Sequence, residues 1–366
     1  MKKFLKVIFQ NILFLLILIS FFELILGDWF KNHSWGDSLR SERLKKKNYS
    51  VEFNDKKYKF TYLKNSLGFR GNEISPEKLK IIMIGGSTTN QRFTPEENTI
   101  VGALNKLFQK EGEDIEIFNG GVDGQSTIGH INNFSKWFTS IENFNPEVII
   151  YYIGINDRLY YNYDPNPENF DYGTFKTQHA FDNMMKSSSR DRILDYIKNN
   201  SFIMQKGKII QNKYFNSKIK KADLSKFKVT YNLEHGYSEN FYTQQDMDKK
   251  FDINDLRKNN KIYYDSFLKR LEYLTKLTKN IGAKPIFVNQ VMNDGQLSEK
   301  LFFTNYIIRD FCLKNNIKFV DLAKNIVLDK FDFYDELHTT PSGSKKIAEY
   351  IYPHLLKYFQ NLQLIN

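Results

Sequence analysis

The sequence predicts an α/β fold in which helices cover a five-stranded parallel β-sheet. From Leu79 onward, short apolar runs alternate with helix-length amphipathic segments, which is typical of strands joined by crossover helices. Several of the amphipathic segments end at Gly or Asn, as helices often do. Because 41% of the residues are hydrophobic and 16% are aromatic, the chain can bury a substantial core, and wholesale disorder is not expected.

The apolar runs predict strands at residues 80–85, 115–120, 147–154, 284–290 and 317–323. The amphipathic segments predict helices within residues 99–112, 127–144, 261–282, 297–316 and 339–359. The last helix has a clear starting signal, because Thr340 is a suitable N-cap and Pro341 suits the first helical position.

The N-terminal segment predicts a membrane anchor at residues 1–27. It begins with three lysines, is uncharged from Val7 to Phe22 and stays apolar to Leu26. This length is close to the ~20 residues that cross a bilayer. No small-x-small cleavage site follows, so an anchor is favoured over a cleaved signal peptide. A large trailing domain can be translocated despite basic flanking residues. We therefore expect a single-pass membrane protein with its N-terminus inside and the bulk of the chain on the extracytoplasmic side.

The remaining chain divides into two further regions. Residues 28–65 read as a polar, basic linker followed by a short hairpin, with turns expected at Asn54-Asp55 and Gly68. Residues 66–366 form the main domain, interrupted by a polar and aromatic insertion at about 158–258. A helix is expected in the insertion within residues 189–210. The insertion acts either as a lid or substrate-binding element or as a passive addition.

Composition argues against several classes of function. The single cysteine, Cys312, rules out an intrachain disulfide. The six histidines have no partner cysteines at metal-ligand spacing, so we expect neither a structural metal nor a cofactor. The net charge of +11 comes from lysines that are spread along the chain, and without a clustered patch a nucleic-acid partner is not expected.

Polar residues and glycines follow the predicted strands at the edge where ligands bind in open parallel sheets. Ser87 follows Gly85-Gly86 after the first strand, Gly124 follows the second, and Asn156 follows the third. Asp335 and His338 come after the fifth strand, just before the last helix. Tyr151, Tyr152, Gln290 and Asn293 also lie near strand ends and are read either as pocket residues or as core and turn residues.

These residue types suit nucleophilic catalysis. A serine hydroxyl is a weak nucleophile until a base takes its proton, and imidazole suits that task near neutral pH. A carboxylate three residues before the histidine can fix its tautomer and stabilise its cation. The N–H groups of Ser87 and Gly124 and the side-chain amide of Asn156 could stabilise a tetrahedral oxyanion. Each signal alone is ordinary for a turn or a cap, but their combination at strand ends predicts a serine hydrolase.

Four blocks carry a resemblance to a known family: "IGGSTT", "NGGVDGQS", "YIGIND" and "DELHTTPSGSKKIA". They resemble the conserved blocks of the SGNH (GDSL-like) hydrolases over about residues 66–355, excluding the insertion. The segment "NSLGFRGNE" resembles a lead-in of membrane-anchored bacterial members. Here Gly85-Gly86-Ser87-Thr88 replaces the Gly-Asp-Ser-Leu that gives the family its name. The missing aspartate is not a member of the triad.

The resemblance implies a fold, a site and an activity. The fold is a flavodoxin-like three-layer α/β/α sandwich. Ser87 would be the nucleophile, His338 the base and Asp335 its orienting acid, with Gly124 and Asn156 as oxyanion donors. We expect a membrane-anchored serine esterase that acts on acyl esters of an envelope glycan or lipid. The alternatives are an O-acyltransferase that modifies a polysaccharide and a non-catalytic glycan-binding relative.

Overall fold

The computed structural model describes residues 2–27, 29, 47–53, 56–161, 197, 201–210, 243–293 and 298–364. The chain forms two compact units. The smaller unit consists of residues 1–33 and 179–223, and the larger unit consists of residues 34–178 and 224–366. All the predicted site residues lie in the larger unit.

The larger unit contains a five-stranded sheet made of β3 (Ile81–Gly85), β4 (Ile117–Gly121), β5 (Val148–Tyr152), β6 (Lys284–Val288) and β7 (Lys318–Val320). The order across the sheet is β4-β3-β5-β6-β7, and every neighbouring pair is parallel. Counted from the first strand of this sheet, the order is 2-1-3-4-5, which is the flavodoxin-like arrangement. The predicted fold is therefore confirmed by the strand topology itself.

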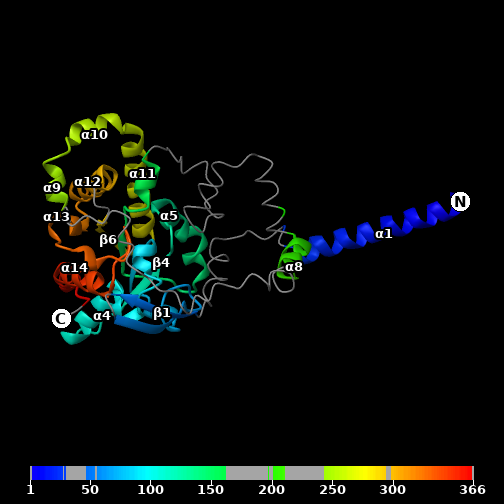
Figure 1. Ribbon diagram of the computed structural model, residues 1–366, viewed down its shortest axis with the longest axis horizontal. Helices are drawn as coiled ribbons and strands as arrows, with labels where there is room; N and C mark the ends of the chain where they lie inside the picture. Colours follow the sequence, from blue (N-terminus) through cyan, green and yellow to red (C-terminus); the bar gives the residue numbers. More distant parts are fainter. Residues whose placement is uncertain are drawn as a thin grey trace. The chain divides into compact units, whose positions relative to one another are not determined.

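One face of the sheet is covered by α4 (Ile100–Lys110) and α14 (Pro341–Asn361), which pack against each other (Figure 1). Alternate strand residues, such as Met83 and Ile150, belong to the same buried apolar cluster as residues of these two helices. Successive side chains on a strand point to opposite faces, so this cluster uses only one of the two faces.

The opposite face is covered by α5 (Thr127–Lys136), α11 (Lys261–Asn280) and α12 (Glu299–Lys314). The Tyr151 hydroxyl on β5 lies 2.6 Å from Thr278 Oγ1 on α11. The Phe287 ring on β6 meets the Phe311 ring of α12 edge-on, with 6.1 Å between the ring centroids. These contacts place a helical layer on each face of the sheet and complete the three-layer sandwich.

Several predicted elements end earlier than the sequence indicated, including the strands predicted at residues 147–154 and 284–290, which end at Tyr152 and Val288. The helix predicted within residues 127–144 stops at Lys136 and is followed by the 3₁₀ turn η3 (Phe138–Ser140). Trp137 follows the helix directly, and its buried indole N–H donates to Leu67 O at 2.7 Å. The last strand ends at Val320, because the short helix α13 (Leu322–Asn325) starts almost immediately. At α14 the Thr340 side chain accepts the Gly343 N–H, as predicted for its N-cap.

The predicted hairpin is present as β1 (Lys47–Phe53) and β2 (Lys56–Tyr62), which pair antiparallel outside the main sheet. Its expected turn, Asn54-Asp55, lies outside the described residues. The hairpin buries an aromatic cluster that includes Phe53, Tyr62 and, from the segment before α14, Tyr334. The hairpin is therefore packed onto the part of the chain that carries Asp335 and His338.

The smaller unit contains α1 (Lys2–Leu26) and α8 (Phe202–Ile210), which is part of the helix expected in the insertion. The Ile203 N–H donates to the Glu23 carboxylate at 3.1 Å. Residues 3–26 are long and apolar enough to cross a membrane, and a signal sequence would have the same properties. Of the insertion, residues 162–196, 198–200 and 211–242 lie outside the described residues. Its end contains α9 (Gln244–Asp248) and α10 (Ile253–Asn259).

Candidate active site

Ser87 opens a short helix directly at the carboxyl end of β3. The strand ends at Gly85, Gly86 is extended, and α3 spans Ser87–Asn90. Ser87 is half-buried, whereas the other residues of α3 are buried. The nucleophile candidate is therefore presented at the sheet edge on a rigid, buried turn of backbone.

His338 bridges Ser87 and Asp335. Its Nε2 lies 2.8 Å from Ser87 Oγ, and its Nδ1 lies 2.7 Å from Asp335 Oδ2. The side chains of His338 and Asp335 are 21% and 45% exposed, so water reaches the imidazole and, more freely, the carboxylate. Residues separated by about 250 positions in the sequence thus form one hydrogen-bonded chain, with the geometry that a base-activated serine requires.

Asp335 is fixed by its own loop. Its Oδ1 accepts the backbone N–H groups of Leu337 at 2.8 Å and His338 at 2.7 Å, which leaves Oδ2 for the imidazole. Burial by itself would raise the pKa of Asp335, but its hydrogen bond to the His338 ring, the His338 charge and the two backbone N–H groups outweigh it. The pKa of this carboxyl therefore lies below its ordinary value, and the group is ionised at neutral pH.

The two predicted oxyanion donors lie side by side. Gly124 has φ +78 in the turn formed by residues 122–125, a conformation that favours glycine. Asn156 Nδ2 donates to Gln125 O at 2.8 Å. It is also close to Gly86, since a Cβ built on Gly86 would lie 2.3 Å from it. An amide nitrogen carries two N–H groups, so this one can hold the turn and still offer a proton beside Ser87.

Asp157 and Arg270 form a buried pair behind these donors that the sequence did not reveal. Asp157 accepts the Thr127 N–H at 3.1 Å and the Thr127 hydroxyl at 2.5 Å. Arg270 donates through Nε to that hydroxyl at 2.9 Å, and its Nη2 lies 3.9 Å from Asp157 Oδ1. Burial raises the pKa of Asp157, and Arg270 and the Thr127 hydrogen bonds offset part of the rise. These contacts hold Asp157, the residue after Asn156, against Thr127 at the start of α5.

The sequence left four strand-end residues as either pocket residues or core and turn residues, and the structure shows where each of them lies. Tyr151 and Tyr152 are core residues of β5, with 1% and 2% exposure. Gln290 lies at the site, because its Nε2 donates to Thr88 Oγ1 and its Oε1 accepts the Ile155 N–H, both at 2.8 Å. Gln290 therefore connects Thr88, which follows Ser87, to Ile155, which precedes Asn156. Asn293 is buried, and its backbone N–H donates to Glu336 O at 2.8 Å.

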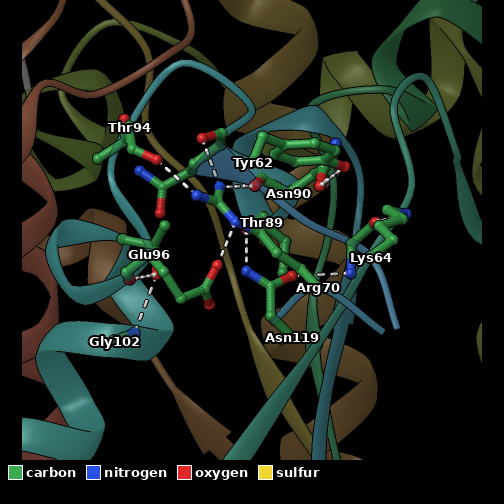
Figure 2. A network of polar contacts seen from close by, with 12 residues as sticks. Tyr62, Lys64, Arg70, Thr89, Asn90, Thr94, Glu96, Gly102 and Asn119 are labelled. Carbon is green, nitrogen blue, oxygen red and sulfur yellow. Dashed lines mark hydrogen bonds and ion pairs between the residues drawn. The ribbon is translucent and has the colours of Figure 1, made fainter. Parts of the chain in front are cut away.

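Arg70, from the "NSLGFRGNE" segment, holds the end of α3 (Figure 2). Its guanidinium is almost fully buried and donates to the carbonyl groups of Asn90, Gln91 and Thr94. It also forms an ion pair with Glu96. Carbonyl groups at a helix end lack partners within the helix, and Arg70 supplies them with a charged donor.

Gln91 then connects the end of α3 to the segment that carries His338. Its Nε2 donates to Thr339 Oγ1 at 3.0 Å and to Ser344 Oγ at 2.6 Å. The His338 ring is also stacked on Tyr334, with 5.6 Å between centroids and 11° between the ring planes. The segment that carries His338 is thus held by Gln91 on one side, and the imidazole itself is stacked on Tyr334 of the hairpin cluster.

The chain resembles known proteins in its structure but matches none of them in its sequence. No protein-family model matches the chain, and no curated protein matches it significantly. The chain is similar in structure to GDSL-type hydrolases. A member of the lipolytic G-D-S-L family from Veillonella parvula has 13% identity and a TM-score of 0.38, with 75% of this chain and 96% of that chain covered.

Two further neighbours are esterases. EstA, an esterase from Pseudoalteromonas sp., has 10% identity and a TM-score of 0.39, with 77% of this chain and 99% of that chain covered. Axe2, an acetylxylan esterase from Geobacillus stearothermophilus, has 12% identity and a TM-score of 0.40, with 75% and 93% covered.

Within the described ranges, no group of three or more His, Cys, Asp or Glu side chains could hold a metal ion. The polar groups that gather at the sheet edge are instead a hydroxyl, an imidazole, a carboxylate and amide donors. Together they can activate a hydroxyl nucleophile and stabilise a negative oxygen beside it.

Proposed function

We propose that this protein is a serine esterase that hydrolyses acyl esters through an acyl-enzyme on Ser87. The observation that carries the proposal is the hydrogen-bonded chain from Ser87 Oγ through His338 to Asp335, at 2.8 Å and 2.7 Å. The proposal gains support from Asn156 and from Gln125, the residue after Gly124, which both lie close to Gly86, the residue before Ser87.

In the first half of the reaction, His338 Nε2 takes the Ser87 proton as Oγ attacks the acyl carbonyl carbon. The carbonyl oxygen becomes an oxyanion, and its donors are the Gly124 N–H and the Asn156 side-chain amide, with the Ser87 N–H as a third. Asp335 holds the imidazole in the tautomer with a free Nε2 and stabilises the imidazolium that forms. The alcohol then leaves with the proton from His338, and the acyl group remains on Ser87.

In the second half, water attacks the acyl carbon while His338 removes a proton from it. The same donors stabilise the second oxyanion, whose collapse breaks the bond to Ser87 Oγ and returns the proton to that oxygen. The products are the free acid and the unmodified enzyme. No cofactor is needed for either half of this sequence.

We further propose that α1 anchors the chain in a membrane and that the catalytic unit faces the extracytoplasmic side. The apolar character of residues 3–26 and the lysines at their start support this arrangement. The substrate would then be an acyl ester of an envelope glycan or lipid. Protease treatment of intact cells should degrade the catalytic unit if it lies outside, and full protection until lysis would contradict this orientation.

The proposed chemistry is tested by covalent labelling of the full-length protein, purified in detergent, with a fluorophosphonate. Mass spectrometry should find the adduct on Ser87, and both Ser87→Ala and His338→Ala should abolish it. The same two variants should lose nearly all hydrolysis of p-nitrophenyl acetate and p-nitrophenyl decanoate. Ser135→Ala is the matched control, because Ser135 is an exposed residue on α5. Full activity in folded Ser87→Ala would refute the mechanism.

Hydrolysis and acyl transfer differ only in the acceptor that attacks the acyl-enzyme. Adding a defined oligosaccharide to the p-nitrophenyl ester assay distinguishes them. Esterase activity predicts free acid as the main product, whereas an O-acyltransferase would form acylated sugar faster than free acid. A folded protein without adduct or turnover would favour the glycan-binding alternative.

A further inference from the structure

A hydrogen-bonded relay joins the hairpin to both parts of the candidate site. The Tyr62 hydroxyl, at the end of β2, donates to Asn90 Oδ1 at 2.9 Å (Figure 2). Asn90 Nδ2 donates to Asp123 Oδ1 at 2.6 Å. Asp123 Oδ2 is paired with Arg92 Nη2 at 2.9 Å. The relay therefore connects β2, the end of α3 and the loop that follows β4.

The middle of the relay lies between the nucleophile and an oxyanion donor. Asn90 is the last residue of α3, the short helix that begins with Ser87. Asp123 immediately precedes Gly124 in the turn formed by residues 122–125. The Asn90 side chain thus spans the gap between the element that presents Ser87 and the loop that presents the Gly124 N–H.

Tyr62 determines which way the Asn90 amide faces. Tyr62 and Asn90 are almost completely buried, and burial raises the pKa of Tyr62, so its hydroxyl keeps its proton and can donate. A donor on one side and a carboxylate acceptor on the other leave the amide a single orientation, with Oδ1 toward Tyr62 and Nδ2 toward Asp123. Without the hydroxyl, the amide could turn or shift.

We propose that Tyr62 and Asn90 are positioning residues that fix the distance between Ser87 and the Gly124 N–H. This inference rests on the proposed function of Ser87. It assigns a positioning role to the hairpin, an element outside the α/β sandwich. The Tyr62 ring also contributes to stability, because it packs in the aromatic cluster and lies under the Arg70 guanidinium at 5.1 Å. The proposed positioning role is separate, because it depends on the hydroxyl.

Tyr62→Phe is the first test, because it removes the hydroxyl and keeps the ring. The kcat of the full-length protein on p-nitrophenyl acetate should fall about tenfold, less than the ~10²–10³-fold cost of losing an oxyanion donor outright. KM should change little, and fluorophosphonate labelling of Ser87 should slow by a similar factor. Tyr58→Phe is the matched control, because Tyr58 packs against the same cluster through Phe53, and it should leave both rates unchanged.

Asn90→Asp is the second test and gives a signature that a loss of packing would not produce. It places a second carboxylate 2.6 Å from Asp123, and two such groups cannot both ionise without strong repulsion. The pH profile of kcat should therefore gain a limb that falls toward high pH. The double variant Asn90→Asp with Asp123→Asn restores one amide facing one carboxylate and should remove that limb. The charged and titratable groups around Asp123 are Arg70, Arg92, Tyr49, Tyr62 and Tyr334.

The outcomes separate the relay from the proposed function. If the unmodified chain takes no fluorophosphonate on Ser87, the proposed function is overturned, and the relay with it. If the unmodified chain is labelled and Tyr62→Phe reacts at the same rate, the relay alone is overturned. A wild-type pH profile for folded Asn90→Asp would also overturn it.

Discussion

Replacing Gly86 with alanine should slow the proposed reaction while leaving the protein folded. Gly86 has φ −85 and ψ −151, an extended conformation that alanine can adopt. A Cβ added there would lie 2.3 Å from Asn156 Nδ2 and 3.2 Å from Gln125 O. The added methyl group would therefore push Asn156 and the Gln125 carbonyl away from Gly86, without straining the backbone.

The size of the effect follows from these distances. Real Cβ contacts essentially never fall below 3.0 Å, so the separation of 2.3 Å must grow by about 0.7 Å. Asn156 can retreat because its amide is the end of a side chain, so the cost in folding stability is small. Moving a catalytic group by about 1 Å can cost on the order of 10² in rate. We therefore expect kcat to fall by up to about 10²-fold, or about 2.7 kcal/mol in activation free energy.

The assay is a double-mutant cycle on p-nitrophenyl acetate hydrolysis. Asn156→Ala alone should lower kcat by about 10²–10³-fold, as loss of an oxyanion donor does elsewhere. If Gly86→Ala acts by displacing Asn156, it should have little further effect in the Asn156→Ala background. Thermal unfolding of each variant shows whether the fold has been preserved.

Gly207→Ala is the matched control, because a Cβ at this helical glycine of α8 meets nothing within 4 Å. It should leave kcat unchanged. A kcat for Gly86→Ala within about threefold of wild type would refute the placement of Asn156 as a donor. If the effects of Gly86→Ala and Asn156→Ala on kcat are fully additive, Gly86→Ala does not act by displacing Asn156.

Three further predictions concern the surroundings of the site. Asp335→Asn should lower kcat by on the order of 10⁴-fold. Since the pKa of Asp335 lies below its ordinary value of about 3.9, a carboxyl NMR titration of the folded wild-type protein should find Asp335 protonated only below about pH 4. Arg270→Leu should lower the free energy of unfolding, measured in urea, by about 3–5 kcal/mol, because it leaves Asp157 buried without its cation. Adding Asp157→Asn should recover part of that loss. Tyr334→Leu removes a stacking contact with His338 worth about 0.5–1.5 kcal/mol, so kcat should fall about threefold to tenfold, and unchanged kinetics would show that the stack does not position the imidazole.

The sequence alone determined the sheet and the place of the site. Residues 81–85 and 148–154, within the apolar runs, are buried on both faces, and a parallel sheet produces that pattern in a chain of alternating strands and helices. Because the strands are parallel, their carboxyl ends share one edge. Ser87, Gly124 and Asn156 were therefore expected together, and the structure brings them together. Their catalytic roles remain proposals.

Only the tertiary structure decided which polar side chains hold that site. Gln290 reaches Thr88, Gln91 reaches Thr339, and Asn90 reaches Asp123, across separations of 202, 248 and 33 residues. The sequence left Gln290 open as a pocket, core or turn residue, and nothing in the pattern marks Gln91 or Asn90, since Asn and Gln are common in loops. Periodicity reports which face of an element is apolar, but the partner of a buried amide depends on which segments packing brings within 3 Å. The supporting hydrogen bonds of the site are for that reason a property of the folded chain, whereas the candidate nucleophile and base can be proposed from the sequence.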